Sequence, residues 1–403
     1  MRLLVLAPLL ACAACTDVVE VLTPPPVAGN APGDAGNDAA PPRDAGISGV
    51  TVDGGQEHTC ATRDGALYCF GSGSRGKLGL GDTSDRTRPA RVGVDADWIW
   101  AAAATQHSCA LRSDGTVHCF GANDVGQLGV PGLQESLVPL QVALPAPAQH
   151  VIAEHNHTCA LLEGGRLSCW GENTEGQLGL GDTYPADNYF EPVEVARDTA
   201  AGPVSSYTAV DTGQGNVCSL RAPGELHCWG RNSANQWNVA GAPLQIRAPV
   251  RVGTASDWIS VQAGQDSSCV INASDELYCS GNNSFANLGT GDRVSRETLT
   301  LIAPGTSFRS VSIDTFHGCA LTTSDALYCW GRAIEGQLGL GDLIDRESPA
   351  LVPGGPWKQV AVGRFFTCAV DQADELFCTG ADDSGQLGLG DTNRRNVLEL
   401  VTF

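Results

Sequence analysis

Fourteen cysteines of this 403-residue chain form seven pairs at a nearly constant period. The two members of a pair are nine or ten residues apart, and the first members follow one another at 49, 50, 59, 51, 50 and 49 residues. Such a fixed period predicts a repeat architecture and not two or three unrelated domains. The pairs are Cys60 and Cys69, Cys109 and Cys119, Cys159 and Cys169, Cys218 and Cys228, Cys269 and Cys279, Cys319 and Cys329, and Cys368 and Cys378.

Each cysteine pair brackets a predicted β-hairpin. In the first copy, Asp64 and Gly65 form a two-residue turn that places Cys60 opposite Cys69. The other six copies carry one more residue, which indicates a three-residue loop with a bulge. A glycine also follows the second cysteine by two positions in every copy, which predicts a positive φ or a close backbone approach there. These glycines are Gly71, Gly121, Gly171, Gly230, Gly281, Gly331 and Gly380.

A short apolar run precedes each pair and predicts a buried strand. An aromatic residue stands eleven positions before the first cysteine in five copies, and valine stands eight positions before it in six. A GQLGLGD-type tail and a Pro/Val-rich strand, such as residues 89–94, follow each hairpin. Four short antiparallel strands in each of seven units predict an all-β, seven-bladed β-propeller over residues 47–403, with little helix. A solenoid would need polar caps, which the sequence lacks.

The units resemble the regulator of chromosome condensation repeat. The segments HTCALLEGGRLSCWGENTEGQLGLGD at 157–182 and HGCALTTSDALYCWGRAIEGQLGLGD at 317–342 carry this resemblance most clearly, and it covers residues 47–403. The resemblance implies a seven-bladed β-propeller. The best-known member of the family is a nuclear exchange factor for a small GTPase on chromatin, but no exchange residue can be placed on this sequence, and fold alone does not carry function.

The sequence departs from the family pattern in its cysteines. The family usually has small or β-branched residues at the two hairpin positions. In an exported protein, fourteen opposed cysteines predict one disulfide in each unit. Zinc ligands in paired knuckles are two to four residues apart, and a catalytic thiol would be single and not sevenfold. We therefore expect no metal, no cofactor and no catalytic residue.

The amino terminus resembles a bacterial lipoprotein signal over residues 1–14. Arg2 precedes an apolar block at residues 3–10, and small residues and cysteines follow. Two cysteines compete for lipidation, because Cys12 follows the better Leu-x-Ala-like box and Cys15 gives the more usual signal length. A plain secretory signal is the alternative. Either version predicts an exported protein of the cell envelope, at the outer membrane, in the periplasm or at the cell surface.

The composition and net charge limit which partners and which kind of membrane association can be expected. Residues 15–46, rich in Pro, Gly, Ala and Asp, predict a disordered linker because they contain too few large apolar side chains to form a core. The net charge of −21 argues against a nucleic-acid partner, which needs a Lys/Arg surface. No apolar run reaches the roughly 18 residues of a membrane span. Membrane association is therefore expected through the lipid anchor.

Two polar columns recur beside the cysteines. A histidine stands two positions before the first cysteine in four copies, at His58, His107, His157 and His317. A ligand ring would require these side chains to face a common channel. We favour packed histidines bonded to a neighbouring loop, because Phe366 fills the same position in the last copy. The aspartates that end the tails, Asp82, Asp182, Asp292, Asp342 and Asp391, predict capped turns and not calcium sites.

The irregular part of the repeat is the best candidate for binding. About nine extra residues lie between the third and fourth copies, within 183–207, and this segment contains Tyr184, Tyr189 and Phe190. The fourth copy also replaces the tail motif with NQWNVAG, which contains Trp237. Aromatic residues in long loops on a rigid scaffold are frequent recognition elements. We expect these four residues to contact a partner.

The function predicted from the sequence is binding. We expect an exported, membrane-tethered monomer that binds a protein or a cell-surface polymer through loops on one face. The alternative is a periplasmic or surface hydrolase or lyase that uses the central channel, and only the histidines support it. The sequence leaves the closure of the ring open, because the strand at 397–403 either completes the first unit or simply meets it.

Overall fold

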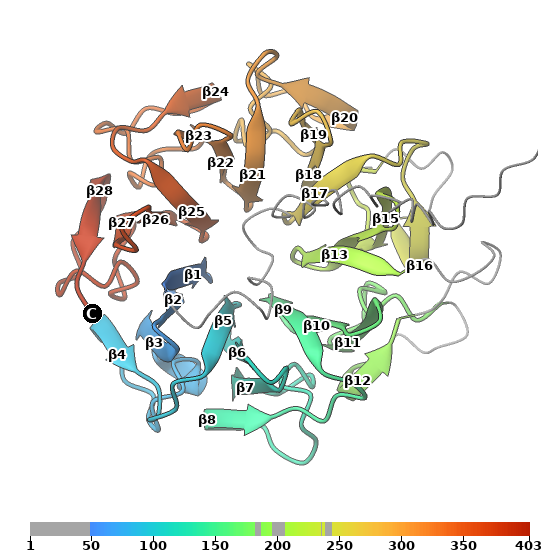
Figure 1. The fold of residues 1–403 in the computed structure, drawn as a ribbon, viewed down its shortest axis with the longest axis vertical. Coiled ribbons are helices and arrows are strands. Elements are labelled where there is room, and N and C mark those ends of the chain that lie inside the picture. Colours follow the sequence, from blue (N-terminus) through green and yellow to red (C-terminus); the bar gives the residue numbers. More distant parts are fainter. Residues whose placement is uncertain (1–48, 182–186, 196–205, 235, 238–243) are drawn as a thin grey trace, which may run out of the picture. The chain divides into compact units, whose positions relative to one another are not determined.

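Seven four-stranded antiparallel sheets make up the described part of the chain in the computed structural model. The described residues are 49–181, 187–195, 206–234, 236–237 and 244–403. They belong to one unit, Asp34–Phe403, and the sheets of that unit lie in a ring around a centre (Figure 1). This is the predicted all-β, seven-bladed propeller. Within these residues the only helix is a single 3-10 turn, η1, at Ser74–Gly76.

Each blade consists of four strands that follow one another in sequence and in space. Blade 1 holds β1 (Val50–Gly54), β2 (His58–Arg63), β3 (Ala66–Gly71) and β4 (Arg86–Arg91), and blade 2 holds β5 (Trp98–Ala103), β6 (His107–Arg112), β7 (Val117–Ala122) and β8 (Glu135–Gln141). Blade 3 holds β9 (Ala148–Glu154), β10 (His157–Leu162), β11 (Arg166–Gly171) and β12 (Tyr189–Glu194), and blade 4 holds β13 (Tyr207–Thr212), β14 (Asn216–Arg221), β15 (Glu225–Arg231) and β16 (Gln245–Arg251). Blade 5 holds β17 (Trp258–Ala263), β18 (Ser267–Asn272), β19 (Leu277–Gly281) and β20 (Arg296–Ile302). Blade 6 holds β21 (Phe308–Ile313), β22 (His317–Thr322), β23 (Leu327–Gly331) and β24 (Arg346–Leu351), and blade 7 holds β25 (Trp357–Val362), β26 (Phe366–Asp371), β27 (Leu376–Gly380) and β28 (Arg395–Val401).

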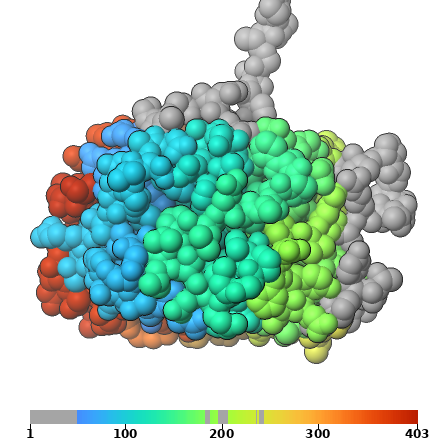
Figure 2. Space-filling model, turned by 90° about the horizontal axis from the view of Figure 1, so that it is seen from below, coloured from blue at the N-terminus to red at the C-terminus, as the bar shows by residue number. Residues whose placement is uncertain are grey.

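The apolar runs of the sequence form the innermost strand of each blade, nearest the centre in Figure 1. In blade 2 every residue of β5 is buried, whereas the outer strand β8 has both exposed and half-buried positions. The core lies mainly between neighbouring blades: Leu67 and Leu78 of blade 1 pack in one cluster with Trp98 and Phe120 of blade 2. Figure 2 shows the surfaces of blades 1 to 3, coloured from blue to green, adjoining in side view.

The hairpins adopt the predicted register. In blade 1, Arg63 pairs with Ala66 and Cys60 pairs with Cys69. Both turn residues, Asp64 and Gly65, have positive φ, at 49° and 80°, as a two-residue hairpin turn requires. In blade 2 the Arg112 N–H donates to the carbonyl of Thr116 across a three-residue loop, which confirms the longer turn predicted there.

Every blade contains one disulfide between its second and third strands. The cysteines are directly opposite each other, with Cα–Cα distances of 4.1 or 4.2 Å. All fourteen are at most 1 % exposed. The seven predicted pairings are therefore the ones observed.

The glycine column also behaves as predicted. All seven glycines have φ between 92° and 114°. A Cβ at Gly71 would lie 2.5 Å from the carbonyl oxygen of Glu57 and 2.6 Å from the Cα of His58. A side chain at this position would therefore meet both an unfavourable backbone conformation and a backbone clash.

Within the described residues, the tails of five blades reach the outer strand of the next blade. The final glycine of the tail donates its N–H to that strand in five interfaces, at 2.7 or 2.8 Å: Gly81 to Leu137, Gly181 to Arg247, Gly291 to Glu347, Gly341 to Asn396 and Gly390 to Thr87. The last of these joins blade 7 to blade 1. Because β28 pairs with β27 and β1 begins the first sheet, the ring closes by contact between blades and not by an exchanged strand.

The predicted signal at 1–14 and linker at 15–46, with Cys12 and Cys15, lie outside the described residues. The first described strand begins at Val50, close to the predicted start of the folded body. Within the part of the chain that the structure describes, no helix has the length and apolar character needed to cross a bilayer.

Candidate functional site

The turns between the first and second strands of the blades surround a small central cavity. We call this side the channel-mouth face, and the opposite side, which carries hairpin turns such as Asp64 and Gly65, the hairpin face. The cavity holds about 60 Å³ of space for water and is lined by the ends of the innermost strands. This volume is well below the roughly 300 Å³ of a small-molecule pocket.

Four carboxylic acids line the cavity: Asp53, Glu154, Asp211 and Asp314. Burial raises the pKa of Asp53 to about 6 and that of Asp211 to about 7, although each carboxylate accepts a backbone N–H of the next blade. Burial also raises the pKa of Glu154 and Asp314, and the other three acids add to the effect on Glu154. The cavity is therefore an acidic environment that disfavours further negative charge.

The acids do not form a metal centre in the described residues, where no group of three His, Cys, Asp or Glu side chains is arranged to hold an ion. Their contacts are structural: Asp53 Oδ2 accepts the Ala103 N–H at 2.8 Å, and Asp211 Oδ2 accepts the Ala263 N–H at 2.6 Å. These hydrogen bonds join the innermost strands of adjacent blades.

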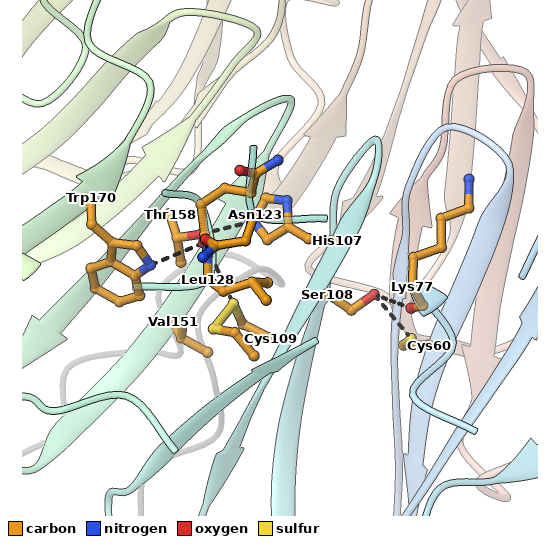
Figure 3. Close-up of a disulfide and its surroundings, with 12 residues drawn as sticks. Cys60, Lys77, His107, Ser108, Cys109, Asn123, Leu128, Val151, Thr158 and Trp170 are labelled. Atoms are coloured by element: carbon orange, nitrogen blue, oxygen red, sulfur yellow. Dashed lines mark hydrogen bonds between the residues drawn. A yellow bond between two sulfur atoms is a disulfide. The ribbon is translucent and has the colours of Figure 1, made fainter. Parts of the chain in front are cut away.

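The repeated histidines lie between the blades. Nε2 contacts a hydroxyl of the following blade in three cases: His58 with Ser108 at 2.7 Å, His107 with Thr158 at 2.8 Å, and His317 with Thr367 at 2.8 Å. Figure 3 shows this arrangement for His107, with Trp170 directed at the same carbonyl as Thr158. The packed-histidine interpretation is supported, and a ring of channel ligands is not.

The hydrogen bonds fix the tautomer of these histidines. Each hydroxyl donates its single hydrogen to a carbonyl of the preceding tail, as Thr158 does to Gln127 at 2.9 Å. The ring nitrogen must therefore be the donor in its own bond, so Nε2 carries the proton. Burial lowers the pKa of His107 and His317 to about 3, so both rings stay neutral at physiological pH.

His157 is the exception in this column. It is 1 % exposed, its pKa is lowered by burial to about 3, and both ring nitrogens lack a hydrogen-bond partner in the described residues. The following blade has Val217 where the others that pair with a histidine have a hydroxyl. The irregularity of this side of the ring therefore extends into the blade interface.

The tail aspartates cap their own turns, as predicted. Asp342 Oδ1 accepts the N–H of Ile344, and Oδ2 accepts a guanidinium N–H of Arg346 at 2.8 Å. Asp82, Asp292 and Asp391 make the same two contacts, the second with Arg86, Arg296 and Arg395. The Asp-x-x-x-Arg spacing is visible in the sequence, so this pairing could have been found there. Asp182 lies outside the described residues.

The predicted binding aromatics are placed differently from one another. Tyr184 lies outside the described residues. Tyr189 and Phe190 are half-buried at the start of β12, where their backbone packs against Gly126 of the preceding tail. Trp237 is 3 % exposed, and its indole N–H donates to Ser268 Oγ at 3.3 Å. It fills the interface between blades 4 and 5 and does not offer a ring to a partner.

The structure brings together a set that the sequence analysis missed. Phe285, Phe316 and Phe365 of blades 5, 6 and 7 contact one another in series, and Arg332 and Arg364 lie over their rings. We call these five residues the Phe–Arg cluster. Three positions before the first cysteine, copies six and seven have phenylalanine, where the other copies have Glu57, Gln106, Asn156, Gly215 and Asp266. This replacement of polar residues or glycine by phenylalanine could have revealed the cluster in the sequence.

Comparison with solved structures shows the fold. Prp20p from Saccharomyces cerevisiae is 20 % identical with a TM-score of 0.74, over 89 % of each chain, and its report concerns binding to Gsp1p and histones. The same yeast protein, bound to Kap60, matches at 19 % identity and a TM-score of 0.74, over 90 % of this chain and 86 % of that one. Human WBSCR16 is 21 % identical with a TM-score of 0.70, over 78 % of this chain and 85 % of its own.

The family comparison agrees with the structural one. No curated protein sequence matches the chain. A family model described as the RCC1-like domain matches residues 66–402, which covers most of the chain and nearly all of the ring. The match to the family model and the seven-bladed fold show that the chain belongs to the RCC1-like domain family.

Proposed function

We propose that this chain is an exported, membrane-tethered scaffold that binds a protein or a cell-surface polymer through loops on one face of its propeller. The proposed role is binding without catalysis, by a monomer, and with no nucleic-acid partner because the net charge is −21. We assign binding to the channel-mouth face. The proposed anchor is the lipid on Cys12 or Cys15.

The observation that carries this proposal is the buried disulfide in every blade. Disulfides of this kind persist in oxidising compartments, which supports an extracellular or envelope location. They also hold the loops in place before any partner arrives. A preorganised surface loses less conformational entropy on binding, which suits a recognition scaffold.

The repeated histidines, which suggested an enzyme, do not support the enzymatic alternative. The four histidines of the repeated column lie in the blade interfaces, where at least three of them bond to the next blade or its loops. The central cavity is small, and two of the carboxylic acids that line it, Asp53 and Asp211, are hydrogen-bonded to the backbone of the next blade. We therefore retain binding as the proposed function.

The proteins that share the fold give limited support. The report on yeast Prp20p describes its binding to Gsp1p and histones, so at least one propeller of this shape presents a protein-binding surface. At 20 % identity this likeness concerns the fold alone, so we transfer neither partner to this chain.

The face assignment can be tested by site-specific photo-crosslinking in the full-length chain. Crosslinkers at Gln214 and Gln265 report on the channel-mouth face, and matched ones at Asp64 and Asp275 report on the hairpin face. With envelope extract as the source of partners, we expect adducts from the first pair only. Adducts from the second pair only, or from none of the four, would overturn the assignment.

The tether is tested separately. Full-length chain is produced in a bacterium that processes lipoproteins, and the membrane and soluble fractions are compared by immunoblotting. We expect either Cys12→Ser or Cys15→Ser to release the chain from the membrane, with mass spectrometry locating the lipid on that cysteine. Unchanged fractionation of both single variants and of the double variant would exclude lipid anchoring.

A further inference from the structure

The Phe–Arg cluster crosses three neighbouring blades on the channel-mouth face. Phe316 and Phe365 precede β22 and β26, and Phe285 lies in the loop after β19 (blades 5 to 7 are adjacent in Figure 1). The N–H of Arg332 donates to the carbonyl of Phe316 at 2.9 Å, and the N–H of Ala381 donates to that of Phe365 at 2.9 Å. The positive φ of the glycine before each donor allows this approach, so the repeat itself positions the cluster.

The rings form a continuous apolar step. The centroids of Phe285 and Phe316 are 4.8 Å apart in an edge-to-face arrangement, and those of Phe316 and Phe365 are 4.7 Å apart and stacked. Phe285 and Phe365 are partly exposed to solvent. Large apolar groups exposed side by side are a common mark of an interaction surface.

Two guanidinium groups cover this step. Arg332 lies 5.1 Å from the centroid of Phe316 and 5.7 Å from that of Phe365, and Arg364 lies 5.4 Å from the centroid of Phe365. Stacking on a ring occupies the flat face of a guanidinium and leaves its N–H edge available. That edge is suited to a carboxylate, which it can bind through two parallel hydrogen bonds.

Neither cluster arginine forms an ion pair within the described residues. Arg364 donates to the neutral side chain of Gln56 at 2.9 Å, and it acts on Asp314 only at longer range. Arg75 on the same face provides the contrast, because it pairs with Asp124 and Glu135, each at 2.8 Å. In a chain with a net charge of −21, two arginines without carboxylate partners are a local site of positive charge.

We propose that the Phe–Arg cluster binds an acidic segment of a protein partner, in which Asp or Glu side chains alternate with large apolar ones. The carboxylates meet the N–H edges of Arg332 and Arg364, and the apolar side chains cover Phe285 and Phe365. This inference rests on the proposed scaffold function and names the chemistry of its partner.

The test uses the full-length chain and two fluorescein-labelled octapeptides, one alternating Glu with Phe and one alternating Gln with Phe. Binding is measured by fluorescence anisotropy at 50 and 300 mM NaCl. We expect the Glu peptide to bind at least about tenfold more tightly than the Gln peptide, since hydrogen bonds between a guanidinium and a carboxylate are stronger than those to a neutral amide. We also expect its affinity to fall with salt.

Variants separate recognition from folding. Arg332→Gln and Arg364→Gln should each weaken the Glu peptide at least about fivefold without changing the Gln peptide. The matched control is Arg75→Gln, which removes the same charge from the same face and should leave peptide affinity within about twofold. Phe285→Leu should weaken both peptides, because it removes the edge-to-face contact and retains apolar volume. Melting temperatures confirm that each variant is folded.

Three results would overturn this inference: equal binding of the two peptides, equal effects of Arg75→Gln and Arg332→Gln, or no binding of the Glu peptide. A fourth is protection of residues 1–46 from protease that disappears in Arg332→Gln, because the chain's own acidic linker would then occupy the cluster. In each case photo-adducts on the channel-mouth face would leave the scaffold function standing. If no crosslinker gave adducts but the Glu peptide bound tightly, the proposed scaffold function would fail and the peptide-binding inference would stand.

Discussion

Two interfaces between blades share the same hydrogen-bonding positions, but only one of them has all the hydrogen bonds. Between blades 6 and 7, His317 donates to Thr367, and Thr367 donates to the carbonyl of Gln337. Between blades 3 and 4, His157 has no such partner because Val217 replaces the hydroxyl. The comparison shows that the histidine, the hydroxyl and the tail carbonyl function as one unit, so a change at one position leaves another unsatisfied.

The incomplete interface keeps its other connections. The Trp229 indole N–H still donates to the carbonyl of Gln177 at 2.9 Å, and Gly181 still donates to Arg247 at 2.7 Å. Within the described residues, the histidine link found at the other interface is missing here. The difference between the two interfaces is therefore a local loss of hydrogen bonding.

The largest expected effect comes from removing a disulfide. In the loop-entropy picture, a ring of about ten residues contributes roughly 2.5 to 3 kcal/mol. We expect the double variant Cys368→Ala/Cys378→Ala to lose about this much free energy of unfolding in urea. The matched variant Cys218→Ala/Cys228→Ala in blade 4 should lose a similar amount. A much smaller loss in blade 4 would mean that the irregular side is loose throughout and not only at its histidine.

The next effect tests the complete interface directly. Thr367→Val keeps the side-chain shape but leaves the Nε2 proton of His317 and the Gln337 carbonyl without this hydroxyl. We expect a loss of about 2 kcal/mol in urea unfolding, within the usual 1 to 3 kcal/mol for buried groups left unpaired. Thr300→Val, at a half-buried outer-strand hydroxyl, is the control. Equal losses in the two variants would contradict a cooperative role for the histidine unit.

The third prediction concerns Asp382, in the blade 7 tail that closes the ring. Asn123 of blade 2 donates its amide to two loop carbonyls and accepts the Leu128 N–H. Asp382 keeps the corresponding bond from Leu387, but its Oδ2 is buried without a partner in the described residues. Burial raises its pKa to about 7. The folded state therefore holds a proton that the unfolded chain releases near pH 4.

The sign of the pH effect follows from that difference in bound protons. Between about pH 4 and pH 7 the folded state binds more protons, so the free energy of unfolding falls as pH rises. Asp382→Asn should remove this contribution, gaining about 1 to 2 kcal/mol at pH 8 and little at pH 4. Asp383→Asn, at the exposed neighbour, removes the same charge and serves as the control. Equal gains in both variants at pH 8 would show that the gain comes from the change in net charge and not from the buried carboxyl group.

The smallest effect is a repair. Val217→Thr places a hydroxyl where His157 lacks one, and the Gln177 carbonyl can accept from it as Gln127 does from Thr158. We expect a gain of about 1 kcal/mol in urea unfolding. In a His157→Phe background the gain should vanish. A loss in place of the gain would show that this interface has relaxed around valine.

The sequence predicted those features that depend on one unit alone. The register of the hairpins, the cysteine pairs and the positive φ of the Gly71 column follow from local turn chemistry, and seven copies make them visible. The tail capping by Asp342 is equally local. The lipidation of Cys12 or Cys15 and a partner for Tyr184 remain predictions.

Features that need two blades could not be predicted in the same way. Phe316 and Phe365 are 49 residues apart in sequence, and only the curvature of the ring stacks them. The unpaired ring of His157 depends on Val217 of the next blade, and the indole N–H of Trp237 donates to Ser268 of the next blade. The pairing of β28 with β27 decided between the two modes of ring closure.

The closing contact has a consequence for how the chain can be cut and rejoined. Gly390 binds Thr87 as the internal tail glycines bind their own neighbours, and Val401 lies in one core cluster with Val50 and Val52. The contact between blades 7 and 1 is thus of the same kind as the contacts between other neighbouring blades. Folding of the ring should therefore not depend on which blade comes first in the chain. Circular permutants that join residue 401 to residue 49 through a short linker and open between Val252 and Trp258 should fold with all seven disulfides in place.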